Sequence, residues 1–176
     1  MLERRVTLHD GTTVLIRPLT AEDAALYPDF LTEVTRDDLR LRFFSAMHEM
    51  APAMIDKLVH YDPKTAMAFI AIEEASGRML GVVRLHDDAL GKSGEFAILL
   101  RSHLKGHGLG WLMMKHIIAY AKDRGLESVQ GEVLAENATM LLMCGELGFH
   151  IADAGERGVK HVTLPLDKVP AVITSH

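Results

Sequence analysis

A glycine-rich loop at the head of a long helical pattern constrains this chain more than any other feature. Residues Lys105–Gly110 hold three glycines and follow the short apolar run Glu95–Leu100. Apolar residues then recur at helical spacing, which predicts a helix over Gly106–Arg124 that ends at Gly125. A nearly continuous apolar run is typical of a strand covered on both faces. We therefore expect a strand, a glycine turn and a helix inside an α/β domain.

The remaining segments predict the elements around this unit. Asp10-Gly11 between two β-branched runs is typical of a hairpin. We further expect helices within residues 20–34, 37–44 and 54–59, strands at 67–73, 79–85 and 129–134, a helix capped by Asn137, and strands at 149–152 and 161–166. This order indicates a mixed α/β fold built on one central sheet.

Composition excludes several classes of protein. The chain has 176 residues, 48% of them apolar and 24% charged, which is the range of one globular domain rather than of a disordered chain. We expect that domain to span residues 1–168, with a flexible tail at 169–176. A net charge of −5 argues against a nucleic-acid partner.

Cysteine, histidine and hydropathy patterns point to a cytoplasmic protein without metal. The single cysteine excludes an internal disulfide framework. The ten histidines show no zinc-type spacing, so we expect no metal site. No apolar stretch has the length of a membrane span, and the first residues lack the apolar core of a signal peptide.

The glycine loop has the properties of an anion cradle. Glycines let the backbone approach a ligand closely, and the free amides of the following helix favour negative charge. Arg101 and Lys105 add positive charge nearby. A Walker loop would need Lys-Ser or Lys-Thr after Gly110, and a dinucleotide fingerprint would need glycine at Trp111, so neither motif is present. Pyrophosphate binding is one interpretation, and a turn that merely packs strand against helix is the other.

Two segments resemble motifs of a known superfamily. Residues 94–110 are similar to the acetyl-CoA motif of the GNAT superfamily of acyl-CoA N-acyltransferases, Gln/Arg-x-x-Gly-x-Gly/Ala, with Lys105 at the basic position and Gly108 and Gly110 matching. Asn137 at a helix start, followed by Gly148-Phe149, resembles the second motif. The resemblance covers residues 5–166 in element order. It implies a GNAT-like fold, a mixed central β-sheet flanked by helices on both faces, with acetyl-CoA as co-substrate.

Within that superfamily, the sequence resembles one branch more specifically. Residues 10–19, 41–45 and 94–110 are similar to the acetyltransferase domain of the bacterial protein-lysine acetyltransferases that regulate acyl-CoA synthetases. It implies transfer of an acetyl group to a protein lysine, with an acyl-CoA synthetase as the protein partner. Many of those enzymes carry a further large domain, for which this chain is too short.

The resemblance also assigns roles to individual residues. Glu95 stands at the position of the general base. Backbone amides near Leu99 and Leu100 would polarise the thioester carbonyl. The residues implied to bind acetyl-CoA are Ile98, Leu99, Leu100, Arg101, Lys105, Gly106, His107, Gly108, Leu109, Gly110 and Asn137.

Several alternatives stay open at this point. Glu95 could be a solvated residue at a strand edge, and Asn137 could be only a helix cap. Cys144 occupies the position where many GNAT enzymes have a tyrosine that acts as the general acid for the thiolate. A small buried residue without that role is the better interpretation of Cys144.

The basic residues and the overall function have competing interpretations too. The arginines at 36, 40 and 42 either contact the 3′-phosphate of CoA or a protein, or form a solvated helix face. The enzyme could instead acetylate a small amine, or the domain could bind acetyl-CoA without catalysis. A homodimer paired through the edge strands of the final segment is a further arrangement that the sequence allows.

Overall fold

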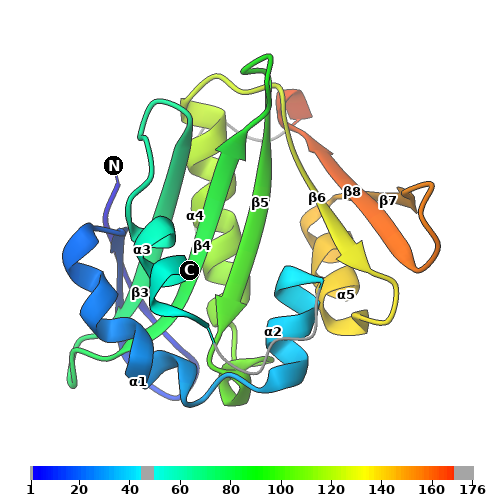
Figure 1. Cartoon of the computed structure of the whole chain (residues 1–176). Coiled ribbons are helices and arrows are strands. Elements are labelled where there is room, and N and C mark those ends of the chain that lie inside the picture. Colours follow the sequence, from blue (N-terminus) through cyan, green and yellow to red (C-terminus); the bar gives the residue numbers. More distant parts are fainter. Residues whose placement is uncertain (1, 45–49, 169–176) are drawn as a thin grey trace.

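The computed structural model describes residues 2–44 and 50–168, and within them eight strands form one sheet (Figure 1). The strands are β1 (Arg4–Thr7), β2 (Thr13–Pro18), β3 (Ala66–Glu73), β4 (Met79–Asp87), β5 (Ser93–Leu100), β6 (Ser128–Leu134), β7 (His150–Asp153) and β8 (Val159–Pro165). The helices are α1 (Tyr27–Leu31), α2 (Arg36–Phe43), α3 (Pro52–Val59), α4 (Leu109–Asp123) and α5 (Ala138–Leu147), with the 3₁₀ turns η1 (Ala21–Leu26), η2 (Ser102–Leu104) and η3 (Leu166–Lys168). Ser45 and the predicted tail at 169–176 lie outside the described residues.

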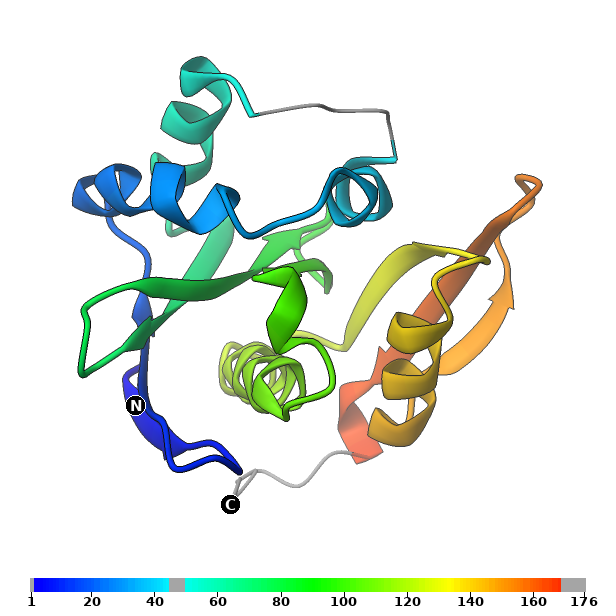
Figure 2. The ribbon, with the colours of Figure 1, turned by 90° about the horizontal axis from the view of Figure 1, so that it is seen from below.

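The sheet is mixed, as the sequence predicts. Its strand order is β1-β2-β3-β4-β5-β6-β8-β7, and β5–β6 is parallel whereas the other neighbouring strands are antiparallel. Figure 2 shows α1, α2 and α3 on one face of the sheet and α4 and α5 on the other. The α/β fold with helices on both faces is therefore confirmed.

Each face has its own buried core. On one face, Met113 and Ile117 of α4 belong to a cluster that includes Phe69 of β3. On the other face, Tyr27 and Phe30 belong to a cluster that includes strand residues of β3, β4 and β5. Burial of these apolar faces, at about 25 cal/mol per Å², holds the helices against the sheet. Among the described residues, no helix is long and apolar enough to cross a membrane.

Two helix boundaries differ from those predicted. The segment after Thr20 forms η1 and then the short α1, because Pro28 has no amide to continue a helical ladder and instead occupies the first turn of α1. The long helix begins at Leu109 rather than Gly106, because Gly106 and Gly108 have φ values of +85° and +92°. These left-handed conformations exclude both residues from a right-handed helix.

Strands β5 and β6 diverge, and this divergence positions the site. Their parallel pairing covers only Ser93–Glu95 against residues 128–130. Beyond Glu95 the two strands separate toward the lower end of Figure 1, where α2 and α5 lie on either side. The second half of β5 therefore has a strand partner on one edge only.

Candidate active site

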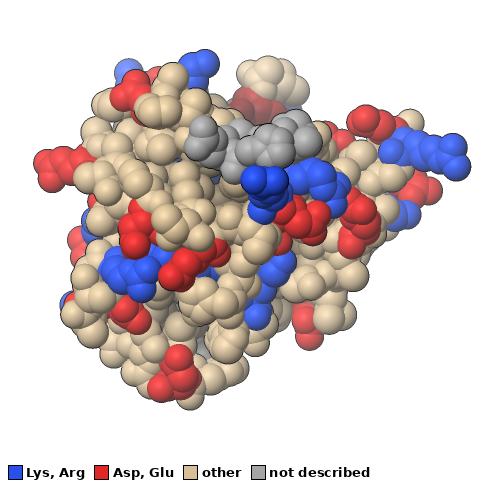
Figure 3. All heavy atoms as spheres, turned by 60° about the horizontal axis from the view of Figure 1, so that its bottom comes forward, with Lys and Arg blue, Asp and Glu red and all other residues tan. Residues whose placement is uncertain are grey.

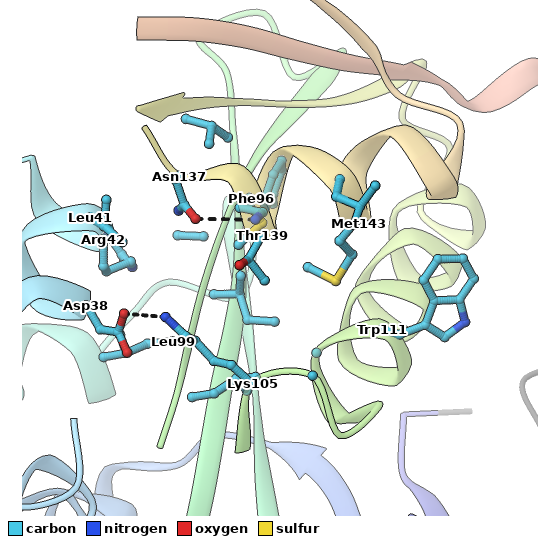
Figure 4. A pocket seen from close by; sticks show the side chains of 18 of the residues that line it. Asp38, Leu41, Arg42, Phe96, Leu99, Lys105, Trp111, Asn137, Thr139 and Met143 are labelled. Atoms are coloured by element: carbon cyan, nitrogen blue, oxygen red, sulfur yellow. Dashed lines mark hydrogen bonds and ion pairs between the residues drawn. The ribbon is translucent and has the colours of Figure 1, made fainter. Parts of the chain in front are cut away.

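A cavity of about 800 Å³ occupies the space where β5 and β6 separate. Its walls come from the second half of β5, from α2, from the loop before α4 and from α5 (Figure 4). Its lining residues are mostly apolar, with a small number of charged groups among them. A cavity of this size and character is typical of a site for a small organic ligand.

Backbone amides of β5 point into this gap. The Arg101 amide donates to the Leu80 carbonyl at 3.0 Å, and the β4–β5 register is unbroken from there through residues 81–87. Residues that alternate along an antiparallel strand direct their amides to opposite edges, so odd-numbered β5 residues bond to β4. The amides that face the β6 side are those of Phe96, Ile98 and Leu100.

This register refines one prediction from the sequence. Of the two residues expected near the thioester carbonyl, Leu100 directs its amide toward the gap, whereas Leu99 directs its amide to β4. Ile98 is the second donor in the right orientation. Among the described residues, no strand pairs with the amides of Ile98 and Leu100 on this edge. An oxyanion developing in the gap would meet these two donors.

The glycine loop supplies a second group of amides. The first intrahelical bond of α4 joins the Leu112 amide to the Gly108 carbonyl at 3.2 Å. The preceding amides of the helix, those of residues 109–111, therefore have no intrahelical acceptor. Gly110 lies so close to Leu100 that a Cβ there would be 3.3 Å from its Cδ1 atom. The loop thus brings the amide-rich helix terminus against the end of β5, as an anion cradle requires.

Two basic residues predicted to bind the cofactor have carboxylate partners. Lys105 lines the cavity, where its Nζ atom donates to Asp38 Oδ1 at 2.6 Å (Figure 4). Arg101 does not line it: its side chain is 1% exposed and donates to Asp29 Oδ2 at 2.7 Å and to the Met79 carbonyl at 2.7 Å. Arg101 therefore ties α1 to β4, and we leave it out of the cofactor site.

Of the other residues predicted to belong to the site, some line the cavity and some do not. The cavity is lined by Glu95, Ile98, Leu99, Leu100, Lys105, Gly106, Gly108, Gly110 and Asn137. It is not lined by His107, which is exposed, or by Leu109, which is fully buried in the core. The structure therefore brings together residues from β5, the loop and α5, but not all of those near them in sequence.

Glu95 lies on the face of β5 that is covered by α1, α2 and α3. Its side chain is on the same side as that of Leu99, which belongs to the core beneath those helices, and it is exposed. The nearest wall on this side is α2, whose Arg42 side chain is half-buried and lines the cavity. Burial, together with repulsion from Arg84, lowers the pKa of Arg42 to about 10, although attraction to Glu95 opposes this.

Comparison with known proteins agrees with this geometry. A family model described as an acetyltransferase (GNAT) domain matches residues 13–150. The chain belongs to the GNAT family. It is also 31% identical over 145 residues to a Pseudomonas aeruginosa protein named as an acetyltransferase, covering 81% of this chain and 78% of that one. The GNAT chain is therefore an acetyltransferase, and its family uses acetyl-CoA.

Solved structures give the same fold. The GNAT domain of S. lividans PAT superposes with a TM-score of 0.85 at 26% identity, covering 93% of this chain and 96% of that one. RimL, a ribosomal L7/L12 α-N-protein acetyltransferase solved with coenzyme A, superposes with a TM-score of 0.72 at 12% identity, covering 88% and 94%. The second likeness concerns the fold alone.

Asn137, which precedes α5, and Cys144, which lies within α5, have different environments. Asn137 lines the cavity and also caps α5, since its Oδ1 atom accepts from the Met140 amide at 3.3 Å. Cys144 is fully buried, and burial raises the pKa of its thiol to about 12. Cys144 is not among the cavity-lining residues, whereas its neighbour Met143 is. The prediction of a small buried residue at 144 is confirmed.

Some cavity residues could not be predicted as a group from sequence spacing. His9, in the turn between β1 and β2, lies so close to the loop that a Cβ on Gly108 would be 3.6 Å from its Cε1 atom. Asp38, Arg42 and Met143 reach the cavity from helices on opposite faces of the sheet. From the sequence, Arg42 belongs to a basic set whose role stays open, and Met143 is interpreted as a residue that fills the core. Within the described residues there is no cluster of histidine, cysteine and carboxylate groups able to hold a metal.

Proposed function

We propose that this GNAT enzyme transfers the acetyl group of acetyl-CoA to a primary amine, that of a protein lysine, by direct attack within a ternary complex. One observation carries the proposal: the divergence of β5 from β6 opens a single cavity that combines free β5 amides, the glycine loop and Glu95. These three parts correspond to the acyl group, the CoA phosphates and the amine.

The glycine loop would hold the pyrophosphate of CoA. Its left-handed glycines keep side chains out of the approach, and the amides of residues 109–111 are free to donate. Lys105 can add a charge-assisted bond once it exchanges Asp38 for a phosphate. Asn137 lies across the cavity, where pantetheine would pass between β5 and α5.

Glu95 would act on the amine. A lysine amine has an unperturbed pKa of about 10.4 and arrives as an ammonium, so Glu95 first accepts one proton, directly or through water. The free amine then forms a C–N bond at the acyl carbon, while the Ile98 and Leu100 amides stabilise the oxyanion. The C–S bond breaks, CoA leaves as a thiolate, and the second amine proton neutralises that thiolate or passes to solvent. The products are an amide, CoA and protonated Glu95.

The acceptor is proposed from likeness as well as from geometry. The S. lividans PAT domain covers nearly the whole of this chain, and the sequence resembles the protein-lysine branch of the superfamily. An acyl-CoA synthetase is the protein substrate that this branch suggests. Fold does not set substrate, so the acceptor has to be tested directly.

The test uses the full chain with acetyl-CoA and a purified acyl-CoA synthetase. We expect CoA release that depends on the synthetase, and mass spectrometry should find an added acetyl group on one synthetase lysine. Release of CoA with small amines but not with the synthetase would replace the protein substrate by a small one. Acetyl-CoA binding without any acetylated amine would show a non-catalytic binding domain.

A further inference from the structure

Two arginines beside Glu95 have no carboxylate partner among the described residues. Arg42 of α2 lines the cavity, and its guanidinium lies 4.3 Å from the centre of the Phe43 ring. Arg84 of β4 lies opposite Ala97, a cavity residue, and donates to the Leu58 carbonyl at 3.3 Å. Neither forms an ion pair with any residue in 2–44 or 50–168.

A buried hydroxyl next to this pair also lacks a partner. Tyr27 is 1% exposed, and its hydroxyl has no hydrogen-bond partner among the described residues. Burial raises the pKa of this hydroxyl, and the positive charges of Arg84 and Arg42 are close enough to oppose that rise. Leaving a buried polar atom unpaired costs about 1–3 kcal/mol, so native proteins usually provide a partner.

Three other arginines that are withdrawn from solvent behave differently. Arg17 pairs with Asp23 at 2.7 Å, Arg101 with Asp29 at 2.7 Å and Arg124 with Asp87 at 2.6 Å. The chain carries five more acidic than basic residues, so carboxylates are not scarce. Acidic and basic side chains also lie next to one another on the face shown in Figure 3. Arg42 and Arg84 therefore differ from these three arginines, which are also withdrawn from solvent but have carboxylate partners.

Glu95 does not account for them. Its charge attracts Arg42, but its carboxylate lies more than 4 Å from that guanidinium, so the two do not form an ion pair. Glu95 is exposed at the cavity, whereas Arg42 is half-buried. A partly desolvated guanidinium with its donors unused is suited to a planar, bidentate acceptor such as a carboxylate.

We propose that Arg42, supported by Arg84 and the Tyr27 hydroxyl, forms a carboxylate-binding subsite beside Glu95, so that the preferred amine acceptor carries a carboxylate near its reacting nitrogen. This inference rests on the proposed function, because it names the acceptor of that reaction. Two sources supply the same chemistry: an acidic side chain next to a protein lysine, and the α-carboxylate of a free amino acid. The subsite disfavours polyamines, whose second cation would meet two guanidinium groups.

The test compares acceptors that differ only in carboxylate content. One pair is acetyl-Glu-Lys-Glu-amide and acetyl-Gln-Lys-Gln-amide, and the other is L-lysine and 1,5-diaminopentane. Turnover and KM are measured by CoA release for the wild type, Arg42→Gln and Arg42→Lys. The matched control is Arg36→Gln, because Arg36 is exposed on the same helix and does not line the cavity. Calorimetry of each peptide with the CoA-bound protein gives binding without transfer.

We expect the wild type to prefer the carboxylate member of at least one pair by about tenfold or more in kcat/KM. Arg42→Gln should raise the KM of that member about tenfold and leave the KM of the neutral member and of acetyl-CoA unchanged. Arg42→Lys should recover part of the loss, and Arg36→Gln should behave as the wild type. The pair that responds identifies the source of the carboxylate.

Other outcomes overturn the subsite and separate its failure from that of the enzyme. Equal losses in kcat for both members would make Arg42 a positioning residue for Glu95. A weaker affinity for acetyl-CoA would place Arg42 in the cofactor site. Transfer without any carboxylate preference would leave the proposed function standing and remove the subsite. Carboxylate binding that depends on Arg42, without any transfer, would keep the subsite and remove the proposed acetylation.

Discussion

The two walls of the cavity offer different groups to a ligand: one offers mainly backbone amides and the other mainly side chains. The wall formed by the glycine loop, α4 and the edge of β5 offers backbone amides, and apart from Lys105 the residues it contributes to the lining are glycines and apolar residues. The wall formed by α2 and the opposite face of β5 offers side chains, mainly Glu95 and Arg42. A wall made of amides suits a ligand that never changes, whereas a wall made of side chains can be altered one residue at a time. We therefore assign CoA to the first and the variable acceptor to the second.

Two arginines illustrate the same difference. Arg101 and Arg42 both have guanidinium groups withdrawn from solvent, but Arg101 bonds Asp29 and the Met79 carbonyl and holds α1 to the sheet. Arg42 has no such partner among the described residues and faces the cavity. Burial alone therefore does not distinguish a structural arginine from a ligand-binding one, because what matters is whether its donors are already used.

The largest effect is expected from Glu95→Gln, which removes the base from the side-chain wall but keeps its size. Turnover should fall by about 10²–10⁴-fold, while the Kd for acetyl-CoA stays nearly constant because the amide wall is unchanged. The remaining rate should rise with pH, since bulk water then supplies the free amine. Steady-state kinetics from pH 6.5 to 9.5, with calorimetry for acetyl-CoA, provide the measurement.

If Glu95→Gln kept wild-type turnover at neutral pH, the general base would have to be another group of that wall. A loss of acetyl-CoA affinity would mean that the two walls are not separate in function. A matched control is Glu146→Gln, which changes a carboxylate on α5 across the cavity from Glu95. If Glu146→Gln lost as much turnover as Glu95→Gln, the assignment of the base to β5 would be wrong.

The amide wall was largely predictable from sequence, and the side-chain wall was not. Glycines between a strand and a helix leave a local pattern, so Gly108 and Gly110 predict a phosphate cradle from sequence alone. The register that turns the Leu100 amide into the gap and the Leu99 amide away depends on pairing with β4, which spacing alone does not give.

The placement of Arg42 and Glu95 on one wall of the cavity likewise depends on tertiary structure. They are far apart in sequence and belong to α2 and β5, so only the packing of α2 on the sheet places them on one wall. The position of Arg101 is likewise not given by its sequence neighbours, which line the cavity, because its own partners lie in α1 and β4. The domain bounds, the cytoplasmic location and the homodimer stay predictions from sequence.

An intermediate effect is expected from Gly108→Val, which alters the amide wall. Valine resists the φ of +92°, and its side chain would occupy space next to His9 at the cavity. The Kd for acetyl-CoA should rise by about tenfold or more, because the amides that follow can no longer meet the phosphates. Gly77→Val is the control: it has a φ of +73° in the turn between β3 and β4, with nothing within 4 Å of its added Cβ.

Both glycine variants should lose similar stability, about 1–2 kcal/mol, from the strained backbone. Only Gly108→Val should lose affinity, and calorimetry together with urea denaturation separates the two quantities. If Gly108→Val folds and binds acetyl-CoA as the wild type does, the phosphate cradle is elsewhere. If Gly77→Val loses as much affinity, the effect comes from general destabilisation rather than from the amide wall.

The smallest effect on activity is expected from Cys144→Ala. Cys144 is the fully buried residue of α5 and does not line either wall, and CoA leaves readily as a thiolate. Turnover should therefore stay within about twofold of the wild type. A loss of about a hundredfold, the scale of a missing general acid, would show that this thiol protonates the leaving group. The substitution should cost about 1 kcal/mol of stability at neutral pH through lost packing.

Stability against pH gives a sharper test of where this thiol lies. Burial raises the pKa of Cys144 from its ordinary value of 9.0 to about 12. Above pH 9 the unfolded chain releases this proton while the folded chain retains it, so deprotonation favours unfolding. The wild type should lose about 1.4 kcal/mol per pH unit that Cys144→Ala does not lose, and other titrating groups cancel in the difference. Urea denaturation at pH 7.5, 9 and 10.5 should show the stability gap narrowing by pH 9 and reversing by pH 10.5, where Cys144→Ala becomes the more stable protein. A constant gap would mean that the thiol is open to water and free to reach the cavity.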